Sequence, residues 1–332
     1  MFKIQKSPDR DFTVLNVGDP QLDYEVWGVK KVTSQNTMRI TLDEIIPKVR
    51  PHLITVSGDF ADEYGRDLYE YFIGYIDPFG VPWAPVMGNH DQEDGCDPYI
   101  VAELLKSAKN CLFDVGEREM GCGNYTVAVE ENGKIVTAFI MMDSHRRTYI
   151  TDEHGNEKRV MVPFTESQYR WYEGEVEKLT ALGCSDSMLI FHIPLFEFRK
   201  AWGAAVKPGA KPSELLVWEP EVKDIWNDSY RDSFGINYEK MATHDESCPL
   251  FSIAKRLGHT KNILCAHDHG NNSSIVYEGI RLTYAQKTGC GGYFECRQNG
   301  ATVITVGSEG VKNIRQEYVD LREMWLTKYD EN

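Results

Sequence analysis

The first ninety residues alternate between short apolar runs and longer amphipathic runs. Residues 12–18, 52–57 and 81–87 are apolar, which predicts three buried strands. Between them, residues 37–49 and 66–76 carry apolar side chains at helical spacing. The order strand, helix, strand, helix, strand indicates an α/β layer structure in which the three strands are parallel.

Each of these three strands ends on polar side chains. The first is followed by Asp19 and Gln21, the second by Asp59, and the third by Asn89 and His90. The carboxyl ends of parallel strands lie at one edge of the sheet, where ligands collect in α/β proteins. We therefore expect these five side chains to converge.

Two later apolar runs end in a similar way. Residues 188–191 lead to His192, and residues 261–266 lead to His267 and His269. Any one of these polar residues could be a turn residue, a helix cap or a buried histidine. Their recurrence at the ends of five strands favours a shared site.

The donor types at the strand ends indicate a metal centre. Carboxylate, amide and imidazole donors without a thiolate suit divalent ions such as Mn, Fe, Zn or Co. Seven donors are too many for one tetrahedral ion and fit two ions that share a carboxylate. The candidate ligands are Asp19, Gln21, Asp59, Asn89, His192, His267 and His269.

The rest of the chain predicts further elements without a linker or repeat. Helices are expected at residues 98–108, from Thr165 onward and at 249–257, and a hairpin at residues 124–130 and 134–142. Alternation at residues 274–277, 281–286 and 301–306 predicts a second, antiparallel-rich sheet. We therefore expect one domain over residues 1–332.

Two segments fit no regular pattern. The polar residues 145–162 are expected to form an exposed loop or flap. Residues 196–247 are expected to form a long, ordered insertion close to His192, because they contain Trp202, Trp218 and Trp226.

Charge and cysteine usage limit the partners and the compartment. The net charge of −15 argues against a nucleic-acid partner, but it does not exclude a small anionic substrate at a metal site. The eight cysteines form no CxxC pair, the first residues lack an apolar leader, and no run is long enough to span a membrane. These features predict reduced thiols, a cytoplasmic location and no membrane partner.

The strand-end motifs together resemble those of the calcineurin-like metallophosphoesterases. The motifs are Asp19-x-Gln21, Gly58-Asp59-x-x-Asp62, Gly88-Asn89-His90-Asp91, His192 and Ala266-His267-Asp268-His269. Residues 80–83, 192–195 and 287–293 resemble the branch that includes purple-acid-phosphatase-like proteins. The resemblance covers nearly the whole chain and implies a four-layer α/β/β/α sandwich of two mixed β-sheets flanked by helices.

The resemblance also implies roles for the site residues. One metal ion would be held by Asp19, Gln21, Asp59 and His269, and the second by Asp59, Asn89, His192 and His267. His90 would stabilise the transferring phosphoryl group or protonate the leaving oxygen, and Asp91 would orient His90. A hydroxide that bridges the two ions would attack phosphorus.

The sequence departs from the family pattern at three positions. Gln21 stands where many members have histidine, and Asp62 stands where the purple enzymes carry the tyrosine that binds ferric iron. Ala266 replaces the usual glycine. We therefore expect a weaker or different metal preference at the first site, and no ferric chemistry.

The expected function is metal-dependent hydrolysis of a phosphate monoester that is small or exposed. Hydrolysis of a phosphodiester or a nucleotide pyrophosphate at the same site remains an alternative, as does a metal-binding scaffold with impaired catalysis. A nuclease is disfavoured because the chain is acidic and lacks a basic, aromatic-lined track. Substrate contacts are expected from Arg146 and Arg147 in the flap and from the insertion.

Overall fold

The structure is a computed structural model that describes residues 1–24, 31–93, 95–215, 217, 219–244, 247–293 and 298–321. Trp218 lies outside the described residues. The strands are β1 (Phe2–Gln5), β2 (Phe12–Val17), β3 (Leu53–Val56), β4 (Trp83–Pro85), β5 (Tyr125–Glu131), β6 (Lys134–Met141), β7 (Arg147–Thr151), β8 (Glu157–Met161), β9 (Ser187–Ile190), β10 (Thr260–Cys265), β11 (Ser274–Tyr277), β12 (Ile280–Tyr284), β13 (Asn299–Gly307) and β14 (Gly310–Val319). The α-helices are α1 (Lys31–Val49), α2 (Arg66–Ile76), α3 (Pro98–Ser107), α4 (Glu166–Ala181), α5 (Glu197–Ala205) and α6 (Pro249–Leu257).

Across the described residues the strands form two large sheets and a separate hairpin. The smaller sheet has the order β14-β13-β2-β3-β4, and the larger one has the order β1-β5-β6-β9-β10-β12-β11. Strands β2, β3 and β4 are parallel, as their alternation with α1 and α2 predicted. Strands β9 and β10 are parallel neighbours in the larger sheet.

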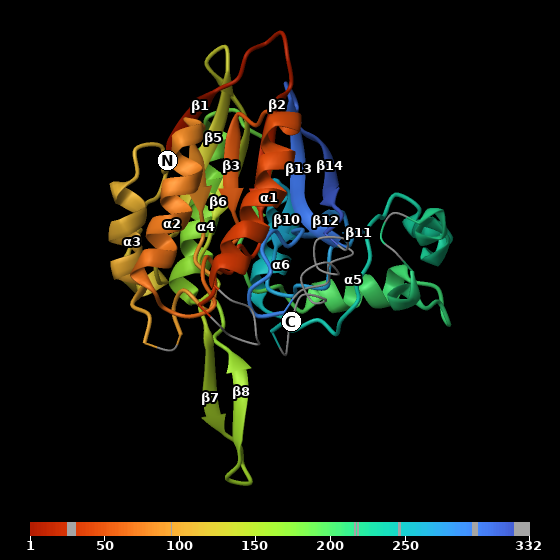
Figure 1. Cartoon of the computed structure of the whole chain (residues 1–332). Helices are drawn as coiled ribbons and strands as arrows, with labels where there is room; N and C mark the ends of the chain where they lie inside the picture. The colour runs from red at the N-terminus through yellow and green to blue at the C-terminus, as the bar shows by residue number, and fades with distance from the viewer. Residues whose placement is uncertain are drawn as a thin grey trace.

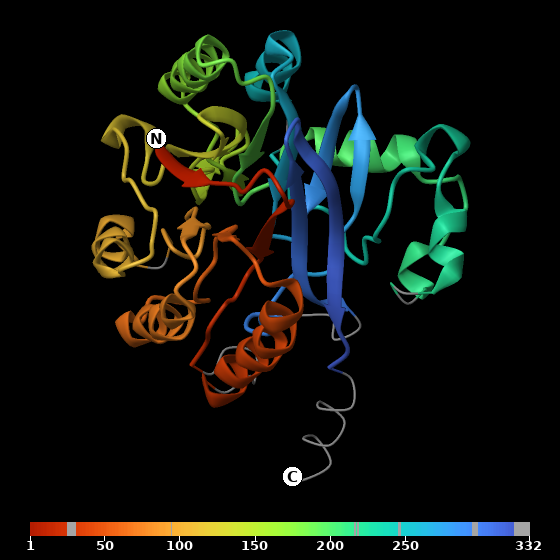
Figure 2. The same ribbon diagram turned by 90° about the horizontal axis from the view of Figure 1, so that it is seen from above.

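The two sheets pack face to face, with helices on both outer sides (Figures 1 and 2). Successive residues of β9 show the layers: Met188 and Ile190 belong to the core shared with the smaller sheet, while Leu189 belongs to the core under α4 and α6. Helices α1, α2 and α3 contribute to the core on the side of the smaller sheet. The four-layer α/β/β/α sandwich is therefore confirmed.

Local sequence signals define several helices well. The capping box of α4 forms as predicted, because the Thr165 hydroxyl accepts from the backbone N–H of Gln168 and the Gln168 side chain accepts from the backbone N–H of Thr165. Helix α1 begins six residues before the predicted segment and continues through Pro47 to Val49. None of the helices among the described residues combines the length and apolar content that a membrane span requires.

The three segments expected to form a second, antiparallel-rich sheet are instead divided between the two large sheets. Strands β11 and β12 extend the larger sheet, where β12 runs parallel to β10. Strand β13 instead pairs with β2 in the smaller sheet, and β14 pairs with β13. Alternating residues predict that a strand exists, but the choice of neighbour depends on contacts distant in sequence.

The two irregular segments have defined structure. Residues 145–162 contain the hairpin β7–β8, which projects from the body of the molecule (Figure 1). Residues 196–247 contain α5 and the 3₁₀ helices η4 (Pro212–Glu214), η5 (Pro220–Ile225) and η6 (Asp228–Tyr230). Trp202 and Trp226 pack edge to face with ring centroids 5.7 Å apart, so this segment has an aromatic contact of its own.

Candidate metal centre

The candidate ligands lie where strand ends from both sheets meet. Four of them have positive φ angles: 43° at Asp19, 40° at Gln21, 52° at Asp59 and 79° at His267. Non-glycine residues adopt this conformation at a cost, and it persists where the surrounding structure imposes it. The turns after β2, β3 and β10 thus hold their polar side chains in a strained backbone.

Glycines allow the turns after β3 and β4 to approach each other. A Cβ added at Gly58 would lie 2.7 Å from both the backbone nitrogen of Gly88 and the Nδ1 of His192. A Cβ added at Gly88 would collide with the side chain of Asp59. Neither position has room for a larger residue, and this explains the Gly-Asp and Gly-Asn-His spacing at the two strand ends.

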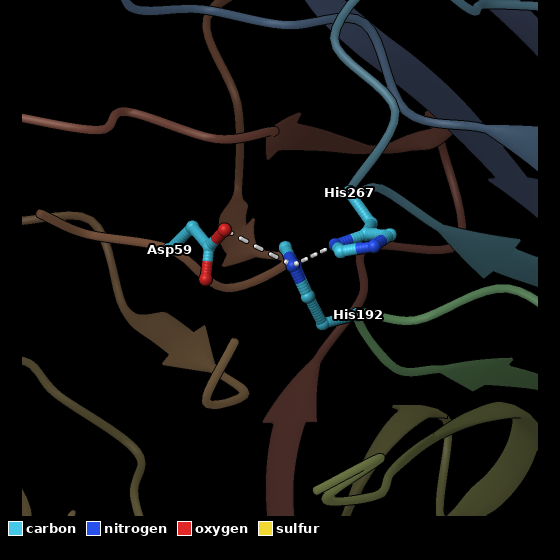
Figure 3. A group of neighbouring side chains, drawn as sticks. All are labelled: Asp59, His192 and His267. Carbon is cyan, nitrogen blue, oxygen red and sulfur yellow. Dashed lines mark hydrogen bonds and ion pairs between the residues drawn. The ribbon is translucent and has the colours of Figure 1, made fainter. Parts of the chain in front are cut away.

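Four donor groups converge on the position expected for the second metal ion. His192 Nε2 lies 3.2 Å from Asp59 Oδ2 and 3.2 Å from His267 Nδ1 (Figure 3). The same nitrogen lies 3.1 Å from Asn89 Oδ1. His192 Nδ1 donates to the carbonyl of Ser57 at 2.9 Å, which leaves Nε2 directed at the other donors. One imidazole proton cannot satisfy three acceptors, so this donor set fits a cation.

The charges of this group depend on one another. Burial would lower the pKa of His192, but the Asp59 carboxylate outweighs burial and raises it to about 9. Burial would raise the pKa of Asp59, but the charges of His192 and His90 hold it below its usual range. Burial and the His192 charge lower the pKa of His267. The pocket therefore keeps Asp59 ionised, as a bridging ligand requires.

A second group surrounds the position expected for the first ion. Asp19, Asp59 and His269 each offer a ligand atom within 4.8 Å of the others, so Asp59 is common to both groups. His269 Nδ1 donates to the carbonyl of Tyr293 at 2.6 Å, which directs its other nitrogen at the site. Burial raises the pKa of Asp19 to about 6. These three donors also fit a cation.

Gln21 is the least suitable member of the first group. Its Oε1 accepts from the buried ammonium of Lys287 at 2.8 Å, and its Nε2 donates to Asp62 Oδ1 at 3.0 Å. Burial lowers the pKa of Lys287, an effect that the Asp19 carboxylate opposes. A lysine therefore contacts the oxygen that would bind the first metal ion. Residues 287–293 carry a motif of the family branch, but nothing in their sequence indicates that Lys287 contacts Gln21.

His90 lies beside the metal positions without being part of either group. Its backbone N–H donates to Asp59 Oδ1 at 3.0 Å, and its Nδ1–H donates to the carbonyl of Asp62 at 2.7 Å. Its Nε2 therefore accepts the N–H of Arg147 Nη2 at 3.2 Å. The imidazole faces the cavity from the edge of the centre, and its catalytic role stays a prediction.

Asp91 has other partners than the one expected. Its carboxylate accepts from the backbone N–H groups of Asp59, Phe60 and Gly88 at 2.8–3.2 Å and from the Tyr69 hydroxyl at 2.8 Å. The orientation of His90 instead comes from Asp62 and Arg147. The expectation that Asp91 orients His90 is therefore corrected: Asp91 joins the turns after β3 and β4, because its local donors are backbone amides.

A cavity of about 340 Å³ opens over both groups of ligands. The flap contributes Arg147 and Arg159 to its wall, and the insertion contributes Glu239, Lys240 and Ala242. Arg146, the other flap arginine predicted to contact substrate, instead donates to the carbonyl of Gln92 at 3.2 Å. Arg159 and Glu239 were not predicted, because nothing local to them indicates which side chains face the cavity.

The chain belongs to the calcineurin-like phosphoesterase family, whose profile matches residues 12–271. Among solved structures, a dimetal phosphatase from Danio rerio superposes with a TM-score of 0.55 at 11% identity, covering 92% of this chain and 98% of that one. This likeness shows the shared fold.

Two relatives in sequence have names that contain the word phosphatase. The chain is 22% identical over 276 residues to probable inactive purple acid phosphatase 14 of Arabidopsis thaliana, a match that covers 76% of this chain. It is 24% identical over 170 residues to phosphatase DCR2 of Saccharomyces cerevisiae, covering 47% of this chain. The chain spans 62% of the length of the first relative and 29% of the second. The match to these relatives therefore does not by itself assign an activity or a substrate to this chain.

Proposed function

We propose that the chain is a metal-dependent phosphoric ester hydrolase that acts on small phosphate monoesters. The observation that carries this proposal is the convergence of Asp59, Asn89 and His267 on His192 Nε2, with His90 beside them at the same cavity. Monoesters are favoured over phosphodiesters and nucleotide pyrophosphates. The cavity of about 340 Å³ suits a small ligand.

The proposed ligand sets are those implied by the family. Asp19, Gln21, Asp59 and His269 would hold one divalent ion, and Asp59, Asn89, His192 and His267 would hold the other. Such ions supply charge neutralisation at phosphorus and a water of lowered pKa. Mn, Fe, Zn and Co all suit these donors.

Three side chains around the cavity have further roles in the proposed reaction. Asp59 supplies the ionised carboxylate that both ligand groups share. His90 presents Nε2 to the cavity, where it accepts from Arg147. Once Arg147 turns to a bound ester and Nε2 takes up a proton, this nitrogen can pass the proton to the oxygen of the leaving group. The carbonyl of Asp62 accepts from His90 Nδ1, and this hydrogen bond keeps Nε2 directed at the cavity.

A screen for phosphate release tests the proposal. Protein purified without chelator and supplied with Mn²⁺ is assayed on phosphate monoesters, diesters and nucleotides, as wild type and as His90→Ala. We expect hydrolysis of monoesters by the wild type and a loss of about 100-fold or more in kcat in the variant. His154→Ala, at an exposed histidine of the flap, is the matched control. Wild type that binds metal but hydrolyses no ester would refute the proposal.

A metal-binding scaffold with impaired catalysis is the second candidate. One observation favours it: the Lys287 ammonium contacts the Gln21 oxygen that the first metal ion would need. The names of some relatives include the words "probable inactive", and this is said of those proteins alone. Metal analysis combined with the ester screen separates the two candidates.

The proposal extends to a cytoplasmic location and to a phosphate ester as the binding partner. None of the seven described cysteines forms a disulfide, which supports a reducing, cytoplasmic environment. The net charge of −15 supports a small-molecule or exposed ester as substrate and argues against a nucleic-acid partner. A single catalytic domain over residues 1–332 stays a prediction.

A further inference from the structure

The hairpin β7–β8 brings two arginines to the cavity from outside the metal-binding sheets. Arg147 lies on β7 and Arg159 on β8, where Arg159 pairs with Tyr149. Both side chains line the cavity together with His90, His267 and His269 (hairpin in Figure 1). Together with Lys240 they bring positive charge to a wall that also carries the carboxylates of Asp59 and Asp62.

Glu93 holds Arg147 in one position. Its Oε1 accepts from the backbone N–H of Arg147 at 2.7 Å and from Nε at 3.0 Å, and its Oε2 accepts from Nη2 at 2.5 Å. The two side chains are only 17% and 10% exposed, so water screens the pair weakly. A guanidinium held by a carboxylate in this way keeps its orientation, which prepares it to bind a planar or tetrahedral anion.

The same carboxylate also reaches the metal centre. Asn89 Nδ2 donates to Glu93 Oε2 at 3.3 Å, and this contact turns Asn89 Oδ1 toward His192. Glu93 therefore joins the flap arginine and an expected metal ligand in one network. Arg147 cannot shift without affecting the amide that faces the second metal position.

Arg147 has a replaceable partner on its cavity side. Its Nη2 donates to His90 Nε2 at 3.2 Å, which is a long contact for a charged donor. A phosphoryl oxygen carries negative charge and is a much stronger acceptor for guanidinium than a neutral imidazole. Arg159 is 49% exposed and lies 3.7 Å from Glu93 Oε2, so its guanidinium stands nearer to solvent along the same wall.

We propose that the flap is a two-arginine receptor for the substrate, an inference that rests on the proposed phosphatase function. Arg147 binds an oxygen of the phosphoryl group beside His90, and Arg159 binds a second anionic group on the leaving part of the same molecule. The preferred substrate class is then a small phosphate ester that carries a further carboxylate or phosphate.

The first test measures binding and needs no turnover. Orthophosphate affinity of the Mn²⁺-loaded protein is measured by calorimetry for wild type, Arg147→Gln and Arg147→Lys. We expect Arg147→Gln to weaken binding about tenfold to 100-fold and Arg147→Lys to recover part of the loss. Lys158→Gln, at an exposed lysine of the same hairpin, is the matched control and should bind as the wild type does. Melting temperature and metal content confirm that each variant is folded and loaded.

Glu93 is a positioning residue in this proposal, and a double-mutant cycle tests that role. Glu93→Gln should weaken orthophosphate binding less than Arg147→Gln, and the double variant should bind no more weakly than Arg147→Gln alone. Losses that simply add would show that Glu93 acts independently of Arg147 and would overturn this part.

The second test measures selectivity. Glycerol phosphate and phosphoglycerate have the same carbon skeleton, and phosphoglycerate carries an additional carboxylate. We expect the wild type to have a higher kcat/KM for phosphoglycerate, and Arg159→Gln to lose about fivefold to tenfold on that substrate alone. An equal effect of Arg159→Gln on both substrates would overturn the second anion contact.

The two proposals fail in different ways. If the wild type hydrolyses no ester, while Arg147→Gln still weakens orthophosphate binding, the phosphatase proposal fails and the receptor for anions stands. If the wild type hydrolyses monoesters and Arg147→Gln changes neither orthophosphate affinity nor kcat/KM, the receptor is refuted and the phosphatase proposal stands.

Discussion

Asp59 combines the two properties that a shared metal ligand needs. It lies within reach of both donor groups, and the charges of His192 and His90 keep its pKa low despite burial. Its positive φ is maintained by the turn after β3, where its own backbone N–H is bound to Asp91. The backbone strain at this residue is therefore offset by a buried hydrogen bond that joins the two neighbouring turns.

Lys287 should weaken the first metal site, and its removal should strengthen it. A buried ammonium 2.8 Å from the Gln21 oxygen repels a divalent ion with an energy of a few kcal/mol. We expect Lys287→Met to tighten Mn²⁺ binding at the weaker of two sites by about tenfold or more. Calorimetric titration of metal-free protein measures both affinities.

A matched control removes a buried lysine that lies away from the metal site. Lys6 is also buried but pairs with Glu131 on β5, so Lys6→Met should leave both Mn²⁺ affinities unchanged. Unchanged or weaker Mn²⁺ binding in Lys287→Met would contradict the proposed repulsion.

At the residue scale, the sequence predicts which side chains converge at the strand ends better than it predicts their neighbours. Asp59 and His192 were predicted because an apolar run and the polar residue after it are adjacent in sequence. Lys287 and Glu93 were not predicted, because their partners Gln21 and Arg147 are distant in sequence. The hydrogen bonds of Asp91 could not be inferred for the same reason.

The turn after β4 requires a glycine at position 88, because a Cβ there would collide with Asp59. Gly88→Ala would place a methyl group against Asp59 and should destabilise the fold by about 1–3 kcal/mol. Metal affinity should fall with it, because Asp59 must move. Denaturant unfolding and calorimetry measure the two effects.

Gly74→Ala is the control for this prediction. Gly74 lies in α2, and a Cβ there would meet nothing within 4 Å. It should therefore raise stability by about 0.5–1 kcal/mol and leave metal affinity unchanged. Equal behaviour of the two alanine variants would show that Gly88 has no special role.

Asp91 should act on stability by joining the ends of β3 and β4. An asparagine in its place would turn an amide NH₂ toward backbone donors in either orientation, at a cost of about 2–4 kcal/mol. Tyr69→Phe removes one hydrogen bond and should cost about 1 kcal/mol. Denaturant unfolding of both variants measures these costs, and a larger loss in Tyr69→Phe than in Asp91→Asn would contradict them.

At the element scale, the sequence predicted helices more accurately than sheet membership. Helices α2 and α6 have the predicted bounds, because amphipathic spacing and terminal residues are local signals. The pairing of β13 with β2 was not predicted, because the paired residues, such as Val303 and Leu15, lie at opposite ends of the sequence. The segment of hairpin β7–β8 is expected from sequence to be an exposed loop or flap, and its two strands are not predicted because their exposed residues lack apolar alternation.

At the scale of the whole molecule, bound metal should hold the two sheets together. Ligands come from turns after β2, β3 and β4 of the smaller sheet and after β9 and β10 of the larger one. We expect a chelator to lower the melting temperature by several degrees, because metal at about 1,000 times its Kd contributes about 4 kcal/mol. Scanning calorimetry with and without EDTA measures this shift.

Asp59→Asn provides the internal control for that experiment. Without the shared carboxylate, this variant should melt at nearly the same temperature with and without chelator. A shift as large as that of the wild type would show that the stabilising metal binds elsewhere.

The hairpin β7–β8 pairs with neither large sheet among the described residues, although it contributes arginines to the cavity. The segment that contacts substrate in our proposal is therefore separate from the framework that holds the metal ligands. Natural selection can lengthen, shorten or recharge such a hairpin while the two sheets that hold the candidate ligands stay intact. Descendants of one ancestral hydrolase could diversify their substrates through this segment, and a laboratory graft of one hairpin onto another framework could follow the same route.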